Sequence, residues 1–220
     1  MALIDGVGLN PDNLKSPPKL TSPSPVISFF KSIFLILFFS AFVFAAVNLP
    51  AYYQVLKFRI RPQSVAIANP VAVGQGKAVE QVENNTLVIP KIGIKAPIKW
   101  DVSSENILES LQNGLVHIKG TGHPNDGKNI FITGHSSNYW WKEGGYNTVL
   151  ALLPKLESGD EIFIAYNGRI ERFIVSQKEE VSKRVVGEFL LADEKQLTIM
   201  TCVPVGTNLG RLLVIAKPAN

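Results

Sequence analysis

The sequence predicts a mainly β domain that follows an apolar, membrane-spanning helix. Three observations support this prediction: an uncharged apolar run at residues 32–49, a series of short β-rich runs from residue 86 onward, and an Asn-Gly pair between two of those runs. Many short strands with few helices are typical of a closed barrel or a sandwich. At 220 residues, the chain has room for one domain of ordinary size and additional segments.

The apolar run predicts a transmembrane helix over residues 26–49. Residues 32–49 carry no charge, and apolar character extends back to residue 26 across Lys31. About 20 apolar residues in a helix cross the core of a bilayer. A buried core helix is disfavoured because the run has no polar face. A cleaved signal peptide is the main rival, but the segment before the run is too long for an ordinary signal.

Composition divides the rest of the chain. Residues 1–25 are rich in proline and polar residues and predict a disordered tail. Residues 50–85 show no sustained period and predict a linker, and residues 86–220 form the globular domain. Basic residues flank the apolar run on both sides, so charge alone does not set its orientation in a membrane.

The domain begins with a β-rich run at residues 86–89 that Pro90 stops. Ser103 or Ser104 is then a candidate N-cap for a short helix with Ile107, Leu108 and Leu111 on one face and Gly114 at its end. Residues 129–133 predict a strand, and residues 148–156 predict a second short helix.

Two hairpins follow. Residues 161–166 and 169–176 are β-rich runs joined by Asn167-Gly168, which is typical of a two-residue turn. Residues 197–202 and 211–216 form the second pair, joined by a longer loop.

Composition also excludes several classes of function. The net charge is only +4 and no basic stripe with interleaved aromatic residues is present, so we expect no nucleic-acid partner. A single cysteine forms neither a disulfide framework nor a zinc cluster, and the three histidines lack metal-ligand spacing. Glu188, Asp193 and Glu194 are too spread to suggest a calcium site. We therefore expect no metal and no cofactor.

Cys202, His135 and Arg211 are the candidate catalytic residues. Each lies at the end or the start of an apolar run. A free thiol has a pKa of about 8.5, so a nucleophilic cysteine needs a base or a cation beside it. His135 is able to take the thiol proton and return it to a leaving amine, and Arg211 offers five N–H donors to an oxyanion. Taken singly, each residue is more typical of a structural or surface role than of catalysis.

Three segments give these residues a context: residues 130–135, residues 197–202 (Leu-Thr-Ile-Met-Thr-Cys) and residues 203–214. In these segments the chain resembles the sortase family of membrane-anchored cysteine transpeptidases. Residues 197–202 are similar to the family's Thr-Leu-x-Thr-Cys signature, with Ile for Leu. Residues 203–214 resemble its following loop, Asn-x-x-Arg motif and last strand. Residues 130–135 (Ile-Phe-Ile-Thr-Gly-His) are similar to the segment that presents the catalytic histidine. Residues 89–94, 114–117 and 158–162 give further matches.

The resemblance implies an eight-stranded β-barrel with one or two short helices. It implies Cys202 as nucleophile, His135 as acid and base, and Arg211 as substrate and oxyanion ligand. We also expect Thr201, Asn208 and His117 near the substrate, although His117 matches a position that is not the base.

The resemblance further implies a substrate and a location. The family cleaves a C-terminal sorting signal of Leu-Pro-x-Thr-Gly type after Thr and joins the acyl product to an amine of cell-wall peptide or pilin lysine. The domain at residues 86–220 is then an extracytoplasmic catalytic domain held at the cell membrane by a single span.

Two departures and two alternatives remain at this stage. Ser136-Ser137 follow the histidine where the family usually has a large residue, and residues 138–145 are unusually aromatic. We expect Trp140 and Trp141 to be buried against the barrel rather than to contact substrate. A cysteine peptidase that hydrolyses the same signal, and a catalytically silent, membrane-tethered binding barrel, are the competing interpretations.

Overall fold

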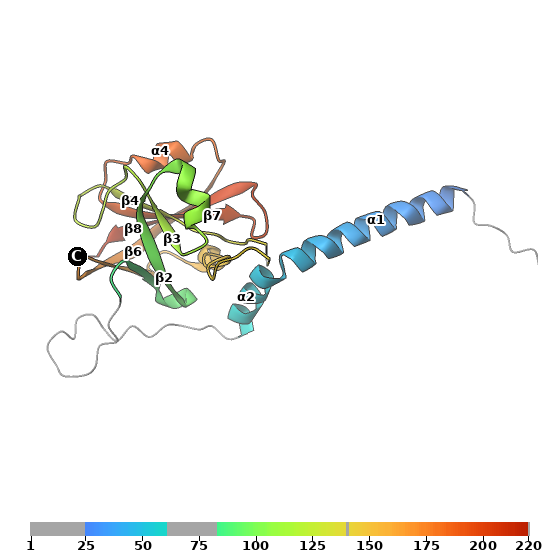
Figure 1. Ribbon diagram of the computed structural model, residues 1–220, viewed down its shortest axis with the longest axis horizontal. Helices are drawn as coiled ribbons and strands as arrows, with labels where there is room; N and C mark the ends of the chain where they lie inside the picture. Colours follow the sequence, from blue (N-terminus) through green and yellow to red (C-terminus); the bar gives the residue numbers. More distant parts are fainter. Residues whose placement is uncertain (1–24, 61–82, 140, 220) are drawn as a thin grey trace, which may run out of the picture. The chain divides into compact units, whose positions relative to one another are not determined.

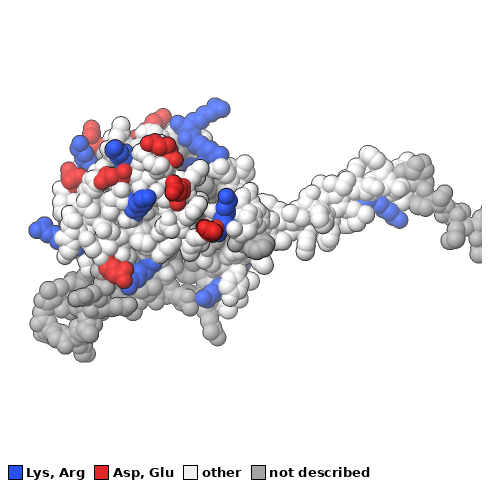
Figure 2. Space-filling model, in the orientation of Figure 1, with Lys and Arg blue, Asp and Glu red and all other residues white. Residues whose placement is uncertain are grey.

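The computed structural model describes residues 25–60, 83–139 and 141–219 (Figure 1). The chain divides into two units between Val43 and Phe44. Helix α1 (Pro25–Val47) includes 22 residues, Val26–Val47, that are apolar enough to cross a membrane, with a mean hydropathy of 2.3. Lys31 is its one charged residue, as the largely white surface of this helix in Figure 2 illustrates. The helix is therefore consistent with the expected anchor, whereas the expected tail lies almost wholly outside the described residues.

Eight strands close a barrel in the order β1-β2-β3-β4-β7-β8-β6-β5, which confirms the expected fold class. The strands are β1 (Thr86–Ile89), β2 (Ile94–Val102), β3 (Leu115–Ile118), β4 (Asn129–Thr133), β5 (Glu161–Tyr166), β6 (Arg169–Val181), β7 (Gln196–Val203) and β8 (Gly210–Pro218). The β2–β3 and β4–β7 pairs are parallel, and the other pairs are antiparallel. Closure leaves no free sheet edge.

Alternating side chains fill the interior of the barrel. In β2, Ile94, Ala96 and Ile98 are buried while the residues between them are exposed, which is the period of a strand with one face toward a core. Branched and aromatic residues from all eight strands join one apolar cluster, with Phe173 fully buried in it. Burying each large apolar side chain contributes about 1.5–3 kcal/mol to the stability of this interior.

The β5–β6 hairpin has the turn that the sequence predicted. Tyr166 pairs with Arg169, so Asn167 and Gly168 are the two loop residues. Their φ angles are 49° and 72°, both positive, as a type I′ turn requires. β6 continues to Val181, beyond the predicted end at residue 176, because its second half pairs with β8.

The helical predictions were correct in part. The first short helix forms as η3 (Ser104–Asn106) followed by α3 (Ile107–Ser110). The second predicted helix, at 148–156, is a series of turns that contains only η4 (Leu153–Lys155), because Pro154 removes a helical N–H. The short helices η2 (Pro90–Ile92) and α4 (Val186–Leu190) were not predicted.

The interval predicted as a linker begins with a second helix, α2 (Leu49–Ile60). Pro50 lies in its first turn, where the missing N–H has no helical partner to lose. Ala51 is buried, and Val55 and Phe58 pack against the barrel core. The rest of the predicted linker, apart from residues 83–85, lies outside the described residues.

Candidate active site

Strand register brings His135, Cys202 and Arg211 together. β4 and β7 run parallel with Thr133 opposite Met200, so two further residues along each strand lead to His135 and Cys202. Cys202 is the direct cross-strand partner of Arg211 in the β7–β8 pair. Neighbouring strands lie about 4.8 Å apart. The three predicted catalytic residues therefore come from three adjacent segments at one end of the barrel.

The alternation of β7 decides which side chains reach the site. Met200 and Cys202 are partly exposed, whereas Ile199, Thr201 and Val203 point into buried surroundings. A directly paired residue on the next strand shares the face of its partner, so the side chain of Arg211 lies on the Cys202 face.

All three residues line one pocket of about 410 Å³. Its lining residues come mostly from β3, β4, α3, β7, β8 and the segments after β4 and β7. Its polar lining comes from Thr133, His135, Asn138, Cys202, Thr207, Asn208, Arg211, Asn48 and Ser137, and its apolar lining from Ile107, Leu108, Leu111, Ile118, Tyr139 and Met200. A pocket lined by both polar and apolar side chains suits a peptide whose reacting carbonyl lies at Cys202.

Hydrogen bonds continue the β4–β7 pairing beyond its last paired residues, Thr133 and Met200. The N–H of Gly134 donates to the carbonyl of Met200 at 3.2 Å, and the hydroxyl of Thr133 donates to the same oxygen at 3.2 Å. The buried hydroxyl of Thr201 donates to the carbonyl of Gly134 at 2.9 Å. These bonds tie the backbone just before His135 to the backbone just before Cys202. Thr201, expected near substrate, thus holds the site from inside the barrel.

The ring of His135 is suited to accept a proton at neutral pH. Burial lowers its pKa below the ordinary value of 6.5, because a desolvated imidazole disfavours the charged form. The neutral ring therefore dominates at pH 7. Within the described part of the chain, no side chain hydrogen-bonds the His135 ring.

The thiol of Cys202 is partly exposed and lies 3.8 Å from Asn208, toward whose Oδ1 atom it donates. Arg211 donates from Nη1 to the carbonyl of Gly210 at 2.9 Å, and its guanidinium carries further N–H donors. Asn208 thus lies at the thiol, and Arg211 lines the same pocket as the cross-strand partner of Cys202.

His117 lies elsewhere. It is fully buried, its Nδ1 accepts the N–H of Asp101 at 3.2 Å, and its Nε2 lies 2.9 Å from the carbonyl of Gly122. Desolvation lowers its pKa below 6.5. The ring does not line the pocket around Cys202, so the structure gives no support to substrate contact and makes His117 a structural residue.

The fold also assembles a histidine cluster that spacing in the sequence did not reveal. One potential metal-ligand atom from each of Asp101, His117 and His123 lies within 4.8 Å of the other two, close enough to hold a metal ion. However, His123 already pairs with Asp101 at 3.0 Å and with Asp126 at 3.2 Å. Both ring nitrogens of His117 also have hydrogen-bond partners. These contacts explain the cluster as a structural one that holds the loop between β3 and β4 in place.

Sequence reasoning missed two parts of the site. Asn48 and Ser137 line the pocket although neither belongs to a catalytic motif. Tyr139 and Trp141 stack with ring centroids 4.7 Å apart and remain about half exposed. The expected burial of Trp141 is therefore wrong, because its ring stacks on Tyr139 and stays about half exposed; Trp140 lies outside the described residues. The aromatic composition of residues 138–145 was the available signal for a surface beside the pocket.

Comparison with known proteins agrees with this fold. Residues 87–219 match the family model for the sortase domain. Sortase C1 from Streptococcus suis superposes with a TM-score of 0.52 at 26% identity, covering 62% of this chain and 73% of that chain. A Clostridium perfringens sortase D5 transpeptidase superposes with a TM-score of 0.51 at 28% identity, covering 61% and 78%. No curated protein sequence matches this chain.

Proposed function

Because this chain belongs to the sortase family, we propose that it is a membrane-anchored cysteine transpeptidase that cleaves a Leu-Pro-x-Thr-Gly-like sorting signal and transfers the acyl product to an amine. The observation that carries the proposal is the convergence of His135, Cys202 and Arg211 on one pocket through the registers of β4, β7 and β8. Sortases as a family act on surface proteins that bear such signals, so the partners are surface proteins and an amine acceptor of the wall or of a pilin.

In the first half-reaction, His135 takes the thiol proton and the Cys202 sulfur attacks the carbonyl carbon of the residue before the scissile bond. The tetrahedral oxyanion is stabilised by N–H donors of Arg211 and by backbone N–H groups near Cys202. When the C–N bond breaks, His135 returns its proton to the leaving amine, and a thioester on Cys202 remains.

In the second half-reaction, the acceptor amine attacks the thioester carbon while His135 takes the amine proton. The C–S bond breaks, an amide forms and the sulfur of Cys202 regains a proton. Apolar side chains that line the pocket, among them Leu108 and Tyr139, contact the residues on the acyl side of the scissile bond. The apolar helix α1 supports a location in the cell membrane. The proposed reaction requires the barrel to lie on the extracytoplasmic side, where sorting-signal proteins arrive.

Intact-mass spectrometry tests this proposal on the detergent-solubilised full chain. The chain is incubated with a panel of Leu-Pro-x-Thr-Gly-like peptides, with and without triglycine as the amine. We expect an acyl adduct that is absent in Cys202→Ala and that triglycine discharges to an amide product. Discharge by water alone would identify a peptidase, and the absence of an adduct with every peptide would refute cleavage of this class of signal.

A further inference from the structure

Asn48 reaches the candidate active site from outside the domain that matches the family model. It lies between α1 and α2, well before residue 87, where the match to the family model begins. Its side chain is only 8% exposed, and its Nδ2 atom donates to the carbonyl of Phe44 at 2.9 Å. The same residue lines the pocket that contains Cys202 and Arg211. Phe44 and Asn48 belong to the same compact unit as the barrel.

Within that unit, Asn48 contacts Gly206 in the β7–β8 loop. A Cβ atom built on Gly206 would lie 2.8 Å from Oδ1 and 2.9 Å from Cγ of Asn48, so the two residues touch with no room for a side chain. Gly206 also has a φ of 90°, a conformation that other residues adopt only with strain. Position 206 therefore favours glycine for two reasons: Asn48 leaves no space for a Cβ atom, and the backbone conformation has a positive φ.

The loop is held from its other side as well. The N–H of Gly206 donates to the hydroxyl of Ser137 at 3.1 Å, two residues after His135. The loop at Gly206 thus lies between Ser137 and Asn48. Two residues later it presents Asn208 to the thiol of Cys202, and it leads into β8, whose second residue is Arg211.

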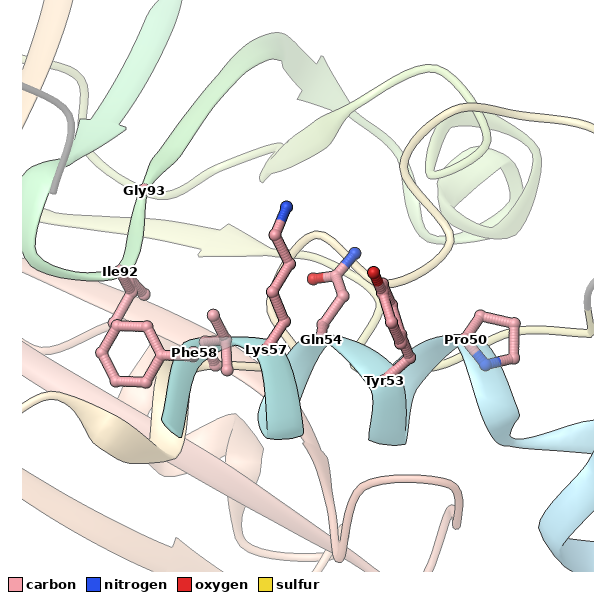
Figure 3. A pocket seen from close by; sticks show the side chains of 8 residues that line it. Pro50, Tyr53, Gln54, Lys57, Phe58, Ile92 and Gly93 are labelled. Carbon is pink, nitrogen blue, oxygen red and sulfur yellow. The ribbon is translucent and has the colours of Figure 1, made fainter. Parts of the chain in front are cut away.

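Helix α2 fixes Asn48 against the barrel. Gln54 donates from Nε2 to the hydroxyl of Thr148 at 2.6 Å, and Val55 and Phe58 pack on the barrel core. Figure 3 shows Gln54 and Lys57 extending from this helix toward the neighbouring barrel segments. A helix docked by both apolar and polar contacts provides a defined position for the residue at its start.

We propose that Asn48 is a positioning residue of the active site: it packs against Gly206 and holds the β7–β8 loop, and with it Asn208 and Arg211, at the thiol of Cys202. The inference rests on the proposed function and extends it to a residue between the anchor and the domain. Misplacement of a reacting group by about 1 Å costs roughly 100-fold in rate, so loss of this support has a measurable effect on turnover.

A double-mutant cycle in the full chain, held in lipid nanodiscs, tests the proposal. The variants are Asn48→Ala, Gly206→Ala and both together, with Leu56→Ala on the exposed face of α2 as a matched control. The readout is the rate of Cys202 adduct formation with the sorting-signal peptide that the wild type uses. We expect each single variant to lose roughly tenfold in rate, Leu56→Ala to match the wild type, and the double variant to lose far less than the product of the singles, because the new methyl occupies the vacated space.

A second measurement separates this inference from the proposed function. Amide hydrogen exchange at residues 203–210 is expected to be faster in Asn48→Ala than in the wild type, with exchange in strand β1 unchanged. This result does not require turnover. Unchanged exchange in the loop, or single-variant effects that simply multiply, would overturn the role of Asn48. A wild type without adduct but with faster loop exchange in Asn48→Ala would refute the transpeptidase and leave the support of the loop standing.

Discussion

Thr201→Val is the substitution that most directly tests how the barrel positions His135. The Thr201 hydroxyl is buried and lies 2.9 Å from the carbonyl oxygen of Gly134, the residue before His135. Valine preserves the shape but loses the hydrogen bond, at a cost of about 1–3 kcal/mol in the free energy of unfolding. Its methyl group also needs more than 2.9 Å from that oxygen, so the Gly134 carbonyl must move by a few tenths of an ångström. We expect roughly a tenfold loss in kcat/KM, equivalent to about 1.4 kcal/mol.

Thr198→Val is the matched control for that prediction. Thr198 lies in the same strand, is equally buried and donates to Oδ1 of Asn129 at 2.9 Å, away from the pocket. Urea unfolding gives the stability of each variant, and adduct formation on Cys202 gives kcat/KM of the folded protein. Both variants should lose similar stability, but only Thr201→Val should lose activity. Equal activities in the two variants would refute the view that the Thr201–Gly134 bond positions His135.

Three further predictions follow. Gly134→Ala places a Cβ atom 2.6 Å from a Leu115 methyl and 2.8 Å from a Leu150 methyl, so urea unfolding should show a loss of about 1–3 kcal/mol; unchanged stability would contradict the tight packing. Arg211→Lys keeps the charge but loses the planar set of donors, and single-turnover assays should show at least a tenfold slower acylation, whereas Arg169→Lys at an exposed strand start should match the wild type. Burial lowers the pKa of His135 below 6.5, so at acidic pH the unfolded state binds a proton that the folded state does not. The free energy of unfolding should therefore fall as the pH drops below 6.5, and His135→Gln should flatten this pH dependence. The same pH dependence in His135→Gln would contradict the contribution of the buried His135 ring.

The sequence by itself determined the main elements and supplied the candidate reacting groups. The Asn167-Gly168 turn requires positive φ at both positions, so a local pattern specified that hairpin. The uncharged run of α1 and the motifs around His135 and Cys202 were equally local signals. In contrast, the prediction of a helix over residues 148–156 was wrong, because it did not allow for the helical N–H that Pro154 lacks.

Only the tertiary structure decided which residues meet. His135 and Cys202 are 67 residues apart in sequence, and it is the parallel register of Thr133 with Met200 that makes them neighbours. Thr201 and His117 were expected near substrate, but alternation in β7 and burial in β3 direct them into the protein. The role of Asn48 has no local signature, because it depends on the close approach of two segments that are distant in sequence. Composition and turn chemistry act over a few residues, whereas register and packing are fixed only when the barrel closes.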